Sequence, residues 1–140
     1  MEIRHALESD LAAVMDLAVG LMDPLEAGPL IRSHIERHHL LVADESDRVV
    51  GALAYRTDWF QCTFVSWVGV HRDFRRRGVA RALFKAVEQV SPSPRLFSSV
   101  EETDGVGIRL HSALGFAPSG HIDNLPQGYR ELLFYKRLRS

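Results

Sequence analysis

The sequence predicts a single α+β domain in which a mixed sheet carries helices on both faces. Apolar segments of helical period alternate with apolar runs of strand length along the chain. A length of 140 residues suits one domain, and 46% hydrophobic with 25% charged residues is typical of soluble globular proteins. No internal repeat, linker or composition shift divides the sequence. We therefore expect one domain over residues 1–140.

The first third of the chain predicts a short strand followed by two helices. Glu2–His5 is expected to form the strand. Apolar residues then recur at steps of three and four over about 11–22, which predicts a helix with Ser9 or Asp10 as its N-cap. Two prolines and a glycine interrupt the next stretch, so the second helix is expected to be short, covering about 30–38.

The middle of the chain predicts a hairpin and a central strand. Residues 40–43 and 49–55 are apolar runs joined by a polar turn at 44–48, a pattern typical of a β-hairpin. Cys62–Val70 has apolar residues at both its even and its odd positions, so both faces of a strand here would be apolar. A strand of this kind is expected at the centre of a sheet, because helices then cover both of its faces.

The remaining chain continues the alternation of helices and strands. Apolar positions at steps of three and four predict a helix over 78–90, which two prolines then close. The last predicted elements are a strand at 95–101, a helix at 105–114 ended by Gly115 in a left-handed cap, and a terminal strand pair at 120–123 and 131–138.

The charge distribution predicts one localised anion site. The formal net charge is only −1, which disfavours a generally basic nucleic-acid-binding protein. Residues 72–85 nevertheless contain six basic residues and one acidic residue, a local +5, so the rest of the chain sums to −6. A cationic island in an otherwise acidic protein favours a single bound anion over a broad electrostatic surface.

Cysteine and histidine usage excludes several kinds of site. Cys62 is the single cysteine, so no internal disulfide or multi-cysteine zinc motif is possible. Of the seven histidines, only His34 and His38 have helical ligand spacing, and the glutamate of a zinc-protease motif is missing between them, so no metal is expected. No segment resembles a signal peptide or reaches the roughly 20 apolar residues that span a bilayer. We expect a cytoplasmic protein without membrane contact.

The cationic island coincides with a predicted junction between a strand and a helix. Three arginines precede Gly78 directly after the central strand, where the helix begins. Free N–H groups of a first helical turn bind anions, and Gly78 lets a phosphate approach the backbone. Arginines at a helix N-terminus oppose the helix dipole unless an anion is present. We therefore expect a pyrophosphate here, with a solvated arginine face or a small nucleic-acid patch as the alternatives.

The residues Arg75-Arg76-Arg77-Gly78-Val79-Ala80 resemble the Arg/Gln-x-x-Gly-x-Gly/Ala signature of the GNAT superfamily of acyl-CoA-dependent N-acyltransferases. The context is also similar, since the signature follows a long apolar strand, and a later helix ends in Leu114-Gly115-Phe116. The resemblance covers nearly the whole chain. It implies a central, mostly antiparallel sheet of six to seven strands with about four helices. It also implies transfer of an acetyl group from acetyl-CoA to a primary amine of a small molecule or peptide, by direct attack in a ternary complex.

The resemblance assigns the cofactor-binding residues. Backbone N–H groups of residues 76–80 would hold the pyrophosphate of acetyl-CoA, and the end of the central strand would pair with its pantetheine arm. In that family two central parallel strands splay apart, which would place the thioester between residues 68–70 and the end of the strand at 96–100. The implied cofactor-binding residues are Val68, Gly69, Val70, Arg75, Arg76, Arg77, Gly78, Val79 and Ala80.

Acyl transfer to an amine also needs a proton acceptor and a proton donor. Glu101 and Glu102, at the end of a predicted strand beside the expected cleft, are the candidate bases. Adjacent strand residues face opposite sides, so at most one of them lines the site. His111 stands where many family members have a tyrosine, and it is the candidate acid for the departing thiolate. As the alternatives, Glu101 and Glu102 would be solvated acids at the end of a strand, and His111 would be a partly buried residue that only fills space on its helix.

The acceptor is expected to contact irregular segments of the chain. Carboxylates there would favour a cationic amine, and aromatic rings would pack against its carbon skeleton. The candidate acceptor-binding residues are Asp23, Asp58, Trp59, Phe60, Asp123 and Tyr129. Trp59 and Phe60 would alternatively serve hairpin packing or a subunit contact, and exposed apolar loops are compatible with a homodimer. A non-catalytic acyl-CoA-binding module remains the alternative function.

Overall fold

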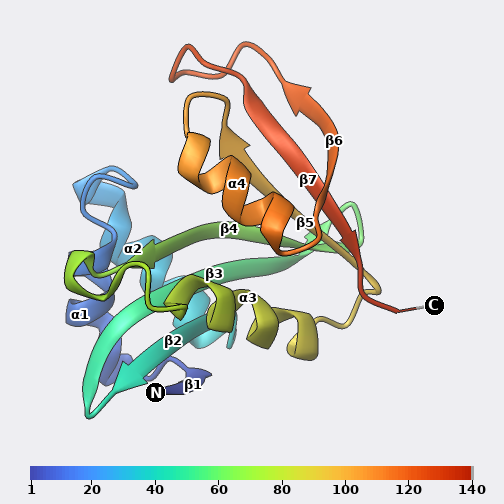
Figure 1. Cartoon of the computed structure of the whole chain (residues 1–140). Helices are drawn as coiled ribbons and strands as arrows, with labels where there is room; N and C mark the ends of the chain where they lie inside the picture. Colours follow the sequence, from blue (N-terminus) through green and yellow to red (C-terminus); the bar gives the residue numbers. More distant parts are fainter. Residues whose placement is uncertain (140) are drawn as a thin grey trace. The chain divides into compact units, whose positions relative to one another are not determined.

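The computed structural model describes residues 1–139, in which seven strands form a mixed, mostly antiparallel sheet accompanied by four α-helices (Figure 1). The elements are β1 (Glu2–His5), α1 (Leu11–Leu17), α2 (Pro24–Glu36), β2 (Leu40–Glu45), β3 (Arg48–Trp59), β4 (Cys62–Val70), α3 (Val79–Val90), β5 (Arg95–Glu101), α4 (Gly105–Ala113), β6 (Ala117–Ile122) and β7 (Glu131–Arg137). Two short 3-10 helices, Glu8–Asp10 and Arg72–Phe74, precede α1 and α3. The strand order is β1-β2-β3-β4-β5-β7-β6. The predicted α+β class is confirmed.

The chain divides into two compact units. The first contains Met1–Arg56 and Ser66–Val90, and the second contains Thr57–Val65 and the segment that begins at Ser91. No helix within residues 1–139 combines the length and the apolarity needed to cross a bilayer.

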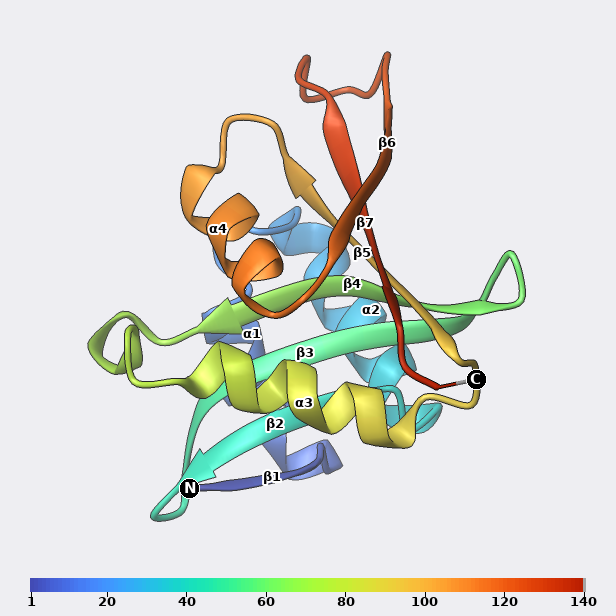
Figure 2. The same cartoon turned by 45° about the vertical axis from the view of Figure 1, so that its right-hand side comes forward.

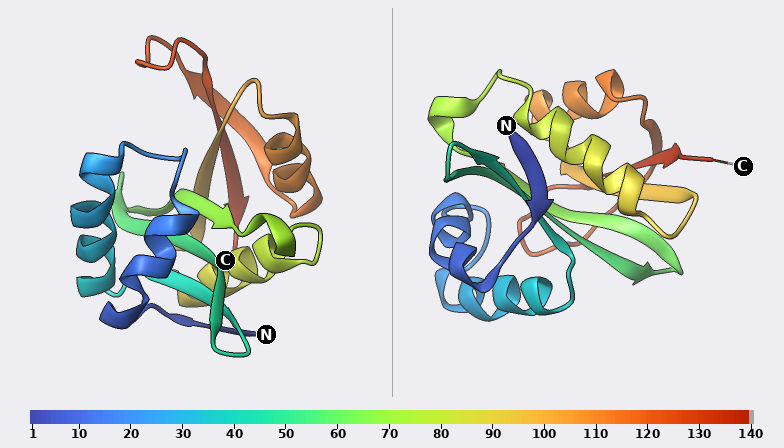
Figure 3. Two further views of the ribbon diagram at one scale, coloured as in Figure 1. Left: turned by 90° about the vertical axis from the view of Figure 1, so that its left-hand side faces the viewer. Right: turned by 90° about the horizontal axis from the view of Figure 1, so that it is seen from below.

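In the first unit, helices cover both faces of antiparallel strands. β1 pairs with β2 and β2 with β3, with a register shift between Ala43 and Asp44. Figure 2 shows α3 crossing one face of these strands, where it contacts β1 and β2. Figure 3 shows α1 and α2 together on the opposite face. Between these two helices and the sheet lies an apolar core that includes the fully buried Val14, Ile31 and Leu40.

Two glycines allow close packing in the first unit. A Cβ at Gly51 of β3 would lie only 2.6 Å from Val79 Cγ1 at the start of α3. A Cβ at Gly69 of β4 would lie 3.1 Å from the Leu17 carbonyl oxygen and 3.3 Å from Leu21 Cδ1. The missing side chains therefore let the N-terminus of α3 approach β3, and let the end of α1 approach β4.

In the second unit, α4 packs against β5 and β7. The start of β4 pairs in parallel with β5, with Thr63 opposite Leu96, whereas β5–β7 and β7–β6 are antiparallel. The His111 ring of α4 stacks on Phe134 of β7 with centroids 5.0 Å apart. Gly107 of α4 lies against Val100 of β5, so the helix rests directly on the strands.

The predicted limits of the first two helices are wrong. α1 ends at Leu17, five residues before the predicted end, because the chain turns through Gly20 with φ +84°. α2 begins at Pro24, well before residue 30. Asp23 caps it by accepting a hydrogen bond from the Leu25 N–H at 2.8 Å, and proline is tolerated in the first turn because its missing N–H has no helical partner there.

The other predicted elements lie close to their expected positions. β2 and β3 are longer than predicted, because Ser46 and Asp47 form a two-residue turn with φ of 50° and 68°. Gly115 has the predicted left-handed conformation, with φ +89°. β6 begins three residues earlier than expected and ends at Ile122.

Candidate functional site

The loop between β4 and α3 has a backbone that suits an anion. Arg76 and Gly78 both adopt left-handed conformations, with φ of 63° and 79°. Alternation of left-handed and other conformations turns successive N–H groups to one side, which forms an anion-binding concavity. A Cβ built at Gly78 would meet nothing within 4 Å, so the backbone faces open space there. Its position at the N-terminus of the 12-residue helix α3 adds the favourable end of the helix dipole.

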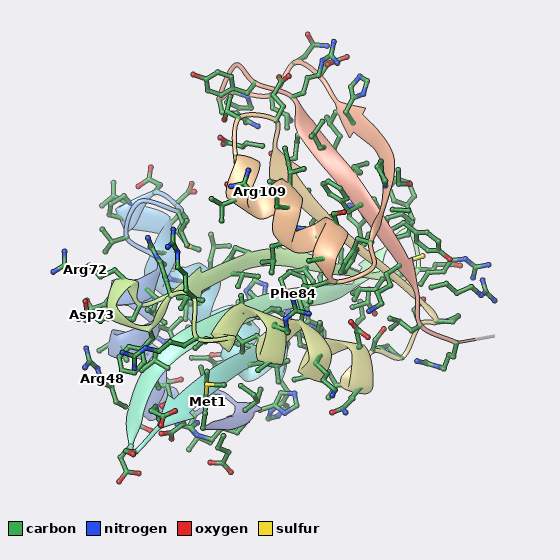
Figure 4. The ribbon with its side chains drawn as sticks, viewed as in Figure 1. Met1, Arg48, Arg72, Asp73, Phe84 and Arg109 are labelled. Carbon is green, nitrogen blue, oxygen red and sulfur yellow. The ribbon has the colours of Figure 1, made fainter. Side chains whose placement is uncertain are left out.

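Arginine side chains surround this loop. Arg75 Nε donates a hydrogen bond to the Val70 carbonyl oxygen at 3.3 Å, which ties the loop to the end of β4. Arg72, Arg76 and Arg77 are exposed. Figure 4 labels Arg72 at the end of the first unit, beside the loop that follows β4. The loop therefore presents several cationic donors next to its open backbone.

Arg48 joins this cluster from β3, and the sequence analysis missed it. Its Nη2 lies 3.1 Å from His71 Nε2, and its guanidinium carbon lies 5.3 Å from the centroid of the Phe74 ring. Figure 4 shows Arg48 and Asp73 at the same end of the unit. Arg48 lies far from the arginine motif in sequence, so no local pattern connects them. Only the long β2–β3 hairpin brings Arg48 to the loop.

The first unit brings together all the predicted cofactor-binding residues. Val68, Gly69 and Val70 form the end of β4, and the loop and the first residues of α3 follow directly. Buried Val79 anchors the start of α3 against Gly51 of β3. The arrangement is a supported strand end, an open cationic loop and a helix N-terminus. Chemically it suits a phosphate-bearing ligand with an extended arm.

His111 is held in the interior of the second unit. It is only 5% exposed, with Nδ1 2.8 Å from the Gly107 carbonyl oxygen and Nε2 2.7 Å from Ser98 Oγ. Because a carbonyl oxygen only accepts, Nδ1 carries the proton and the Ser98 hydroxyl donates to Nε2. Burial lowers the pKa of His111, although its bond to Gly107 and the charge of Asp104 act in the opposite direction. The ring is therefore a neutral acceptor here, and the acid role stays a prediction.

A polar pocket of ≈ 600 Å³ lies beyond the end of β5 in the second unit. Glu102 Oε2 accepts a hydrogen bond from the Arg130 backbone N–H. Asp123 lies 3.4 Å from both Arg130 Nε and His121 Nε2. The pocket is lined by Glu102, Asp123, Asn124, Leu125, Gly128, Tyr129 and Arg130. The pocket therefore brings together the predicted base Glu102 and the predicted acceptor-binding residues Asp123 and Tyr129.

The two candidate bases have different surroundings. Glu102 lines the polar pocket, whereas Glu101 is the last residue of β5 and lies opposite Glu131 of β7. Glu131 in turn accepts a hydrogen bond from the Ser99 hydroxyl at 2.7 Å. The geometry therefore favours Glu102 over Glu101 as a group that meets a ligand in this pocket.

The other predicted acceptor-binding residues lie elsewhere. Phe60 lines a separate cavity of ≈ 340 Å³ with Cys62 and Arg95, at the start of β5. Trp59 stacks on Phe64 at 4.8 Å, which is the hairpin packing alternative. β5 rises ~3.3 Å per residue, so its two ends lie about 20 Å apart. Because β4 and β5 run in parallel, the tip before β4 lies beside the start of β5, away from Glu102.

The remaining predicted candidates have structural partners. Asp23 uses its side chain to cap α2, and Asp58 is exposed beside the hairpin tip. His34 Nδ1 lies 2.8 Å from the Leu30 carbonyl oxygen within the same helix. Among the described residues, no group of three or more His, Cys, Asp or Glu side chains is placed to hold a metal ion.

Comparisons with known proteins give the family. Residues 11–116 match the family model described as the acetyltransferase (GNAT) family. A GNAT-family acetyltransferase from Bacillus cereus ATCC 10987 is 28% identical with a TM-score of 0.89, over 97% of this chain and 96% of that chain. A ribosomal-protein-alanine N-acetyltransferase from Brucella melitensis is 22% identical with a TM-score of 0.79, over 98% and 99% of the two chains.

A further similar structure was determined with a ligand. It is a putative acetyltransferase from Salmonella typhimurium with its cofactor acetyl-CoA, 20% identical with a TM-score of 0.80, over 100% of this chain and 95% of that chain. A search of curated proteins found no significant match. The family match covers more than half of the chain and agrees with the sheet, the loop and the helix order. The chain therefore belongs to the GNAT family of acetyltransferases.

Proposed function

We propose that this chain transfers the acetyl group of acetyl-CoA to a primary amine of a small molecule or peptide, by direct attack in a ternary complex. The observation that carries the proposal is the loop before α3, where left-handed Arg76 and Gly78 leave the backbone open among arginines. Membership of an acetyltransferase family supports the same conclusion. A polar pocket in the second unit, whose lining includes the carboxylates of Glu102 and Asp123, supports an amine as the acceptor.

On the cofactor side, backbone N–H groups of residues 76–80 would bind the pyrophosphate. A side chain at Gly78 would project into the space that a phosphate needs, which supports this assignment. Val68, Gly69 and Val70 would pair with the amide groups of the pantetheine arm, as an added strand would. Arg75 holds the loop closed through the Val70 carbonyl oxygen, and in this way it supports the binding geometry.

On the acceptor side, the polar pocket beyond β5 would receive a cationic amine. Glu102 and Asp123 supply negative charge, and Tyr129 supplies an aromatic surface with a hydroxyl group. Alkyl amines titrate near pH 10, so the amine must lose a proton before it attacks. We assign Glu102 as the acceptor of that proton, directly or through water, because the Arg130 N–H holds its carboxylate at the pocket.

The reaction balances in charge and atoms. The amine nitrogen bonds to the thioester carbonyl carbon, and the carbon–sulfur bond breaks from the tetrahedral intermediate. The ammonium group gives up one proton to Glu102 before the attack, and the nitrogen loses a second proton when the amide forms. One of these protons reaches the departing thiolate, and the other is released to solvent. The contribution of this chain is a fixed carboxylate at a polar pocket and a loop that holds the nucleotide.

Isothermal titration calorimetry with acetyl-CoA tests the cofactor half of the proposal. Gly78→Val should weaken binding at least ten-fold, because a β-branched side chain would fill the phosphate site. Gly120→Val is a matched control, since Gly120 also has a positive φ and open space around a Cβ, but lies in β6. It should bind acetyl-CoA as the wild type does. Equal affinity of the two variants would show that the loop is not the site.

A further inference from the structure

β5 and β7 turn one of their two faces away from α4. Directly opposite residues of an antiparallel ladder point to the same face, and the direction alternates along each strand. Ser98 and Phe134 are opposite each other, and both contact His111 of α4, so the even-numbered residues of these strands face the helix. The odd-numbered residues face the other side. Among residues 57–65 and 91–139, α4 is the only helix, so no helix of the second unit covers that side.

This side of β5 and β7, the open face, carries its charges sorted by sign between two ends. Arg95 lies opposite Arg137, and together they form the arginine end. Glu101 lies opposite Glu131, and together they form the glutamate end, about 20 Å further along β5. The pairs between the two ends are Phe97 with Tyr135 and Ser99 with Leu133.

Each end of the open face is electrostatically unfavourable in a single chain. Like charges directly opposite each other on neighbouring strands destabilise the ladder. Arg95, Arg137 and Glu101 are exposed, and no ion pair among the described residues engages any of the three. Glu131 accepts a hydrogen bond from the Ser99 hydroxyl at 2.7 Å, which holds the carboxylate in place but leaves its charge. A group of opposite sign would therefore stabilise each end.

Aromatic side chains lie between the two charged ends and beside them. The ring centroids of Phe97 and Tyr135 lie 5.1 Å apart, and that of Trp59 lies 5.0 Å from Phe97. Phe64 of β4 pairs in register with Phe97, and Trp59 stacks on Phe64 at 4.8 Å. All four rings are half-buried. Aromatic rings are enriched at the centres of protein interfaces, where they supply apolar area.

We propose that the open face is a dimer interface and that a second copy of this chain occupies it. A two-fold axis between the two open faces, perpendicular to the strands, reverses the strand direction of one copy relative to the other. The arginine end of each copy then lies over the glutamate end of its partner, and the aromatic rings of the two copies meet between the ends. The open face is thus self-complementary, as a two-fold interface between identical chains requires.

The dimensions and the charges fit this arrangement. Sheets packed face to face lie about 10 Å apart, a gap that an arginine and a glutamate side chain bridge together. A partner whose strands run in the same direction would bring like charges together at both ends, which disfavours that orientation. The charges therefore select the orientation of the partner, while the aromatic rings supply the apolar contact. Dimerisation through this face does not depend on the proposed acetyl transfer.

Sedimentation velocity over a range of protein concentrations, without acetyl-CoA, tests the dimer. The wild type should shift from monomer to dimer as the concentration rises. The acidic variant Arg95→Glu/Arg137→Glu and the basic variant Glu101→Arg/Glu131→Arg should each raise the dimer Kd by about ten-fold or more, because like charges then meet across the interface. An equimolar mixture of the two variants should form a 1:1 heterodimer, because opposite charges meet again.

A matched control reverses the same number of charges outside the open face. Arg37→Glu/Arg109→Glu changes two exposed arginines, one at the end of α2 and one on α4. Neither residue lies in β5 or β7, so this variant should dimerise as the wild type does. Added NaCl should raise the Kd of the wild-type dimer, because salt screens exposed ion pairs.

The oligomeric state of these proteins decides the proposal. A wild type that remains a monomer at about 1 mM would overturn it. A dimer with unchanged Kd in both the acidic and the basic variant would place the interface on another surface. Variants that are folded by circular dichroism but do not associate when mixed would show that the two ends do not pair. If a reversal variant does not fold, Arg95→Gln/Arg137→Gln removes the charge alone, and an unchanged dimer Kd there would equally overturn the proposal.

Discussion

His111 illustrates how a residue's surroundings determine its chemistry. Its position in the sequence suggests a proton donor, but the structure places it in the interior, with Nδ1 bonded to Gly107 and Nε2 to Ser98. Its packing on Phe116 and Phe134 makes it part of the contact between α4 and the strands. The sequence could locate His111 on a helix. It could not show that Ser98 of β5 faces it, because that contact depends on how α4 rests on the sheet.

The lowered pKa of His111 predicts a pH dependence of stability. Burial disfavours the charged ring in the folded state, whereas the unfolded residue titrates near its ordinary value of about 6.5. The stabilising effect of the neutral ring is therefore complete above pH 6.5, and it is lost progressively as the pH falls below that value. Urea unfolding between pH 5 and 8 should show this loss in the wild type and a flatter profile in His111→Phe. His34→Gln should keep the wild-type profile, and equal profiles in all three proteins would contradict the assignment.

The Ser98–His111 hydrogen bond should also be measurable as a coupling. Ser98→Ala leaves Nε2 of a buried ring without its donor, which should cost about 1–2 kcal/mol of unfolding free energy. In the double variant Ser98→Ala/His111→Phe both polar partners are removed. Its destabilisation should be smaller than the sum of the two single changes, as measured by denaturant unfolding at pH 7.5. Strict additivity would show that the contact contributes nothing.

Glu102 is the residue on which the proposed chemistry depends. Glu102→Gln should lower kcat/KM for amine acetylation by about 100-fold, as expected for loss of a general base, and should leave the dissociation constant of acetyl-CoA unchanged. Glu101→Gln, one position earlier and outside the polar pocket, should change kcat/KM by about two-fold at most. A larger effect of Glu101→Gln than of Glu102→Gln would exchange the two assignments. Steady-state kinetics with varied amine at saturating acetyl-CoA supplies the measurement.

At the scale of elements, the sequence predicts a strand or helix best where the spacing of its apolar residues and the proline or turn residues at its ends indicate the same limits. β5 has the predicted bounds, Arg95–Glu101, because buried and exposed residues alternate between a proline and a polar turn. α2 starts earlier than the sequence predicts, because Pro24 opens this helix instead of breaking it, and Pro29 lies inside it. Asp23 caps the helix that begins with Pro24. Irregular sequence is the only mark of the expected acceptor segments, and it does not show at which end of β5 each of them lies.

The approach of α3 to β3 predicts opposite effects for two glycine substitutions. Gly51→Ala should destabilise the protein by about 1–3 kcal/mol, because its Cβ would lie 2.6 Å from Val79 Cγ1. It should also weaken acetyl-CoA binding by moving the start of α3. Gly105→Ala should stabilise the protein by about 0.4–1 kcal/mol, since Gly105 begins α4 and a Cβ there would meet only the flexible end of Arg109. Denaturant unfolding measures both, and a stabilising Gly51→Ala would refute the packing argument.

For the whole molecule, the uneven charge was the most informative property of the sequence. It predicted an anion site between residues 72 and 85, and the structure adds Arg48 from a distant strand to the same cluster. The acidic remainder includes Glu102 and Asp123, which line the polar pocket. Single-sequence patterns located the loop because its residues are consecutive. They could not assemble Arg48 or the pocket, because those arrangements depend on tertiary contacts.

Ligand binding should stabilise the folded chain as a whole. A ligand that binds only the folded state at about 100 times its Kd adds about 2.7 kcal/mol, which corresponds to a rise in Tm of several degrees. We therefore expect acetyl-CoA to raise the Tm and the effect to diminish with added salt, since the loop is cationic. A Tm unaffected by millimolar acetyl-CoA would contradict the cofactor assignment.

Transfer of an acetyl group from acetyl-CoA to a primary amine is the reaction proposed for this chain. The most direct measurement is release of the free thiol of coenzyme A across a panel of primary amines and short peptides with free N-termini, with mass spectrometry of each product. We predict thiol release well above hydrolysis for at least one cationic amine, with the acetyl group on its nitrogen. Tight binding of acetyl-CoA without acetylation of any amine across such a panel would contradict the claim.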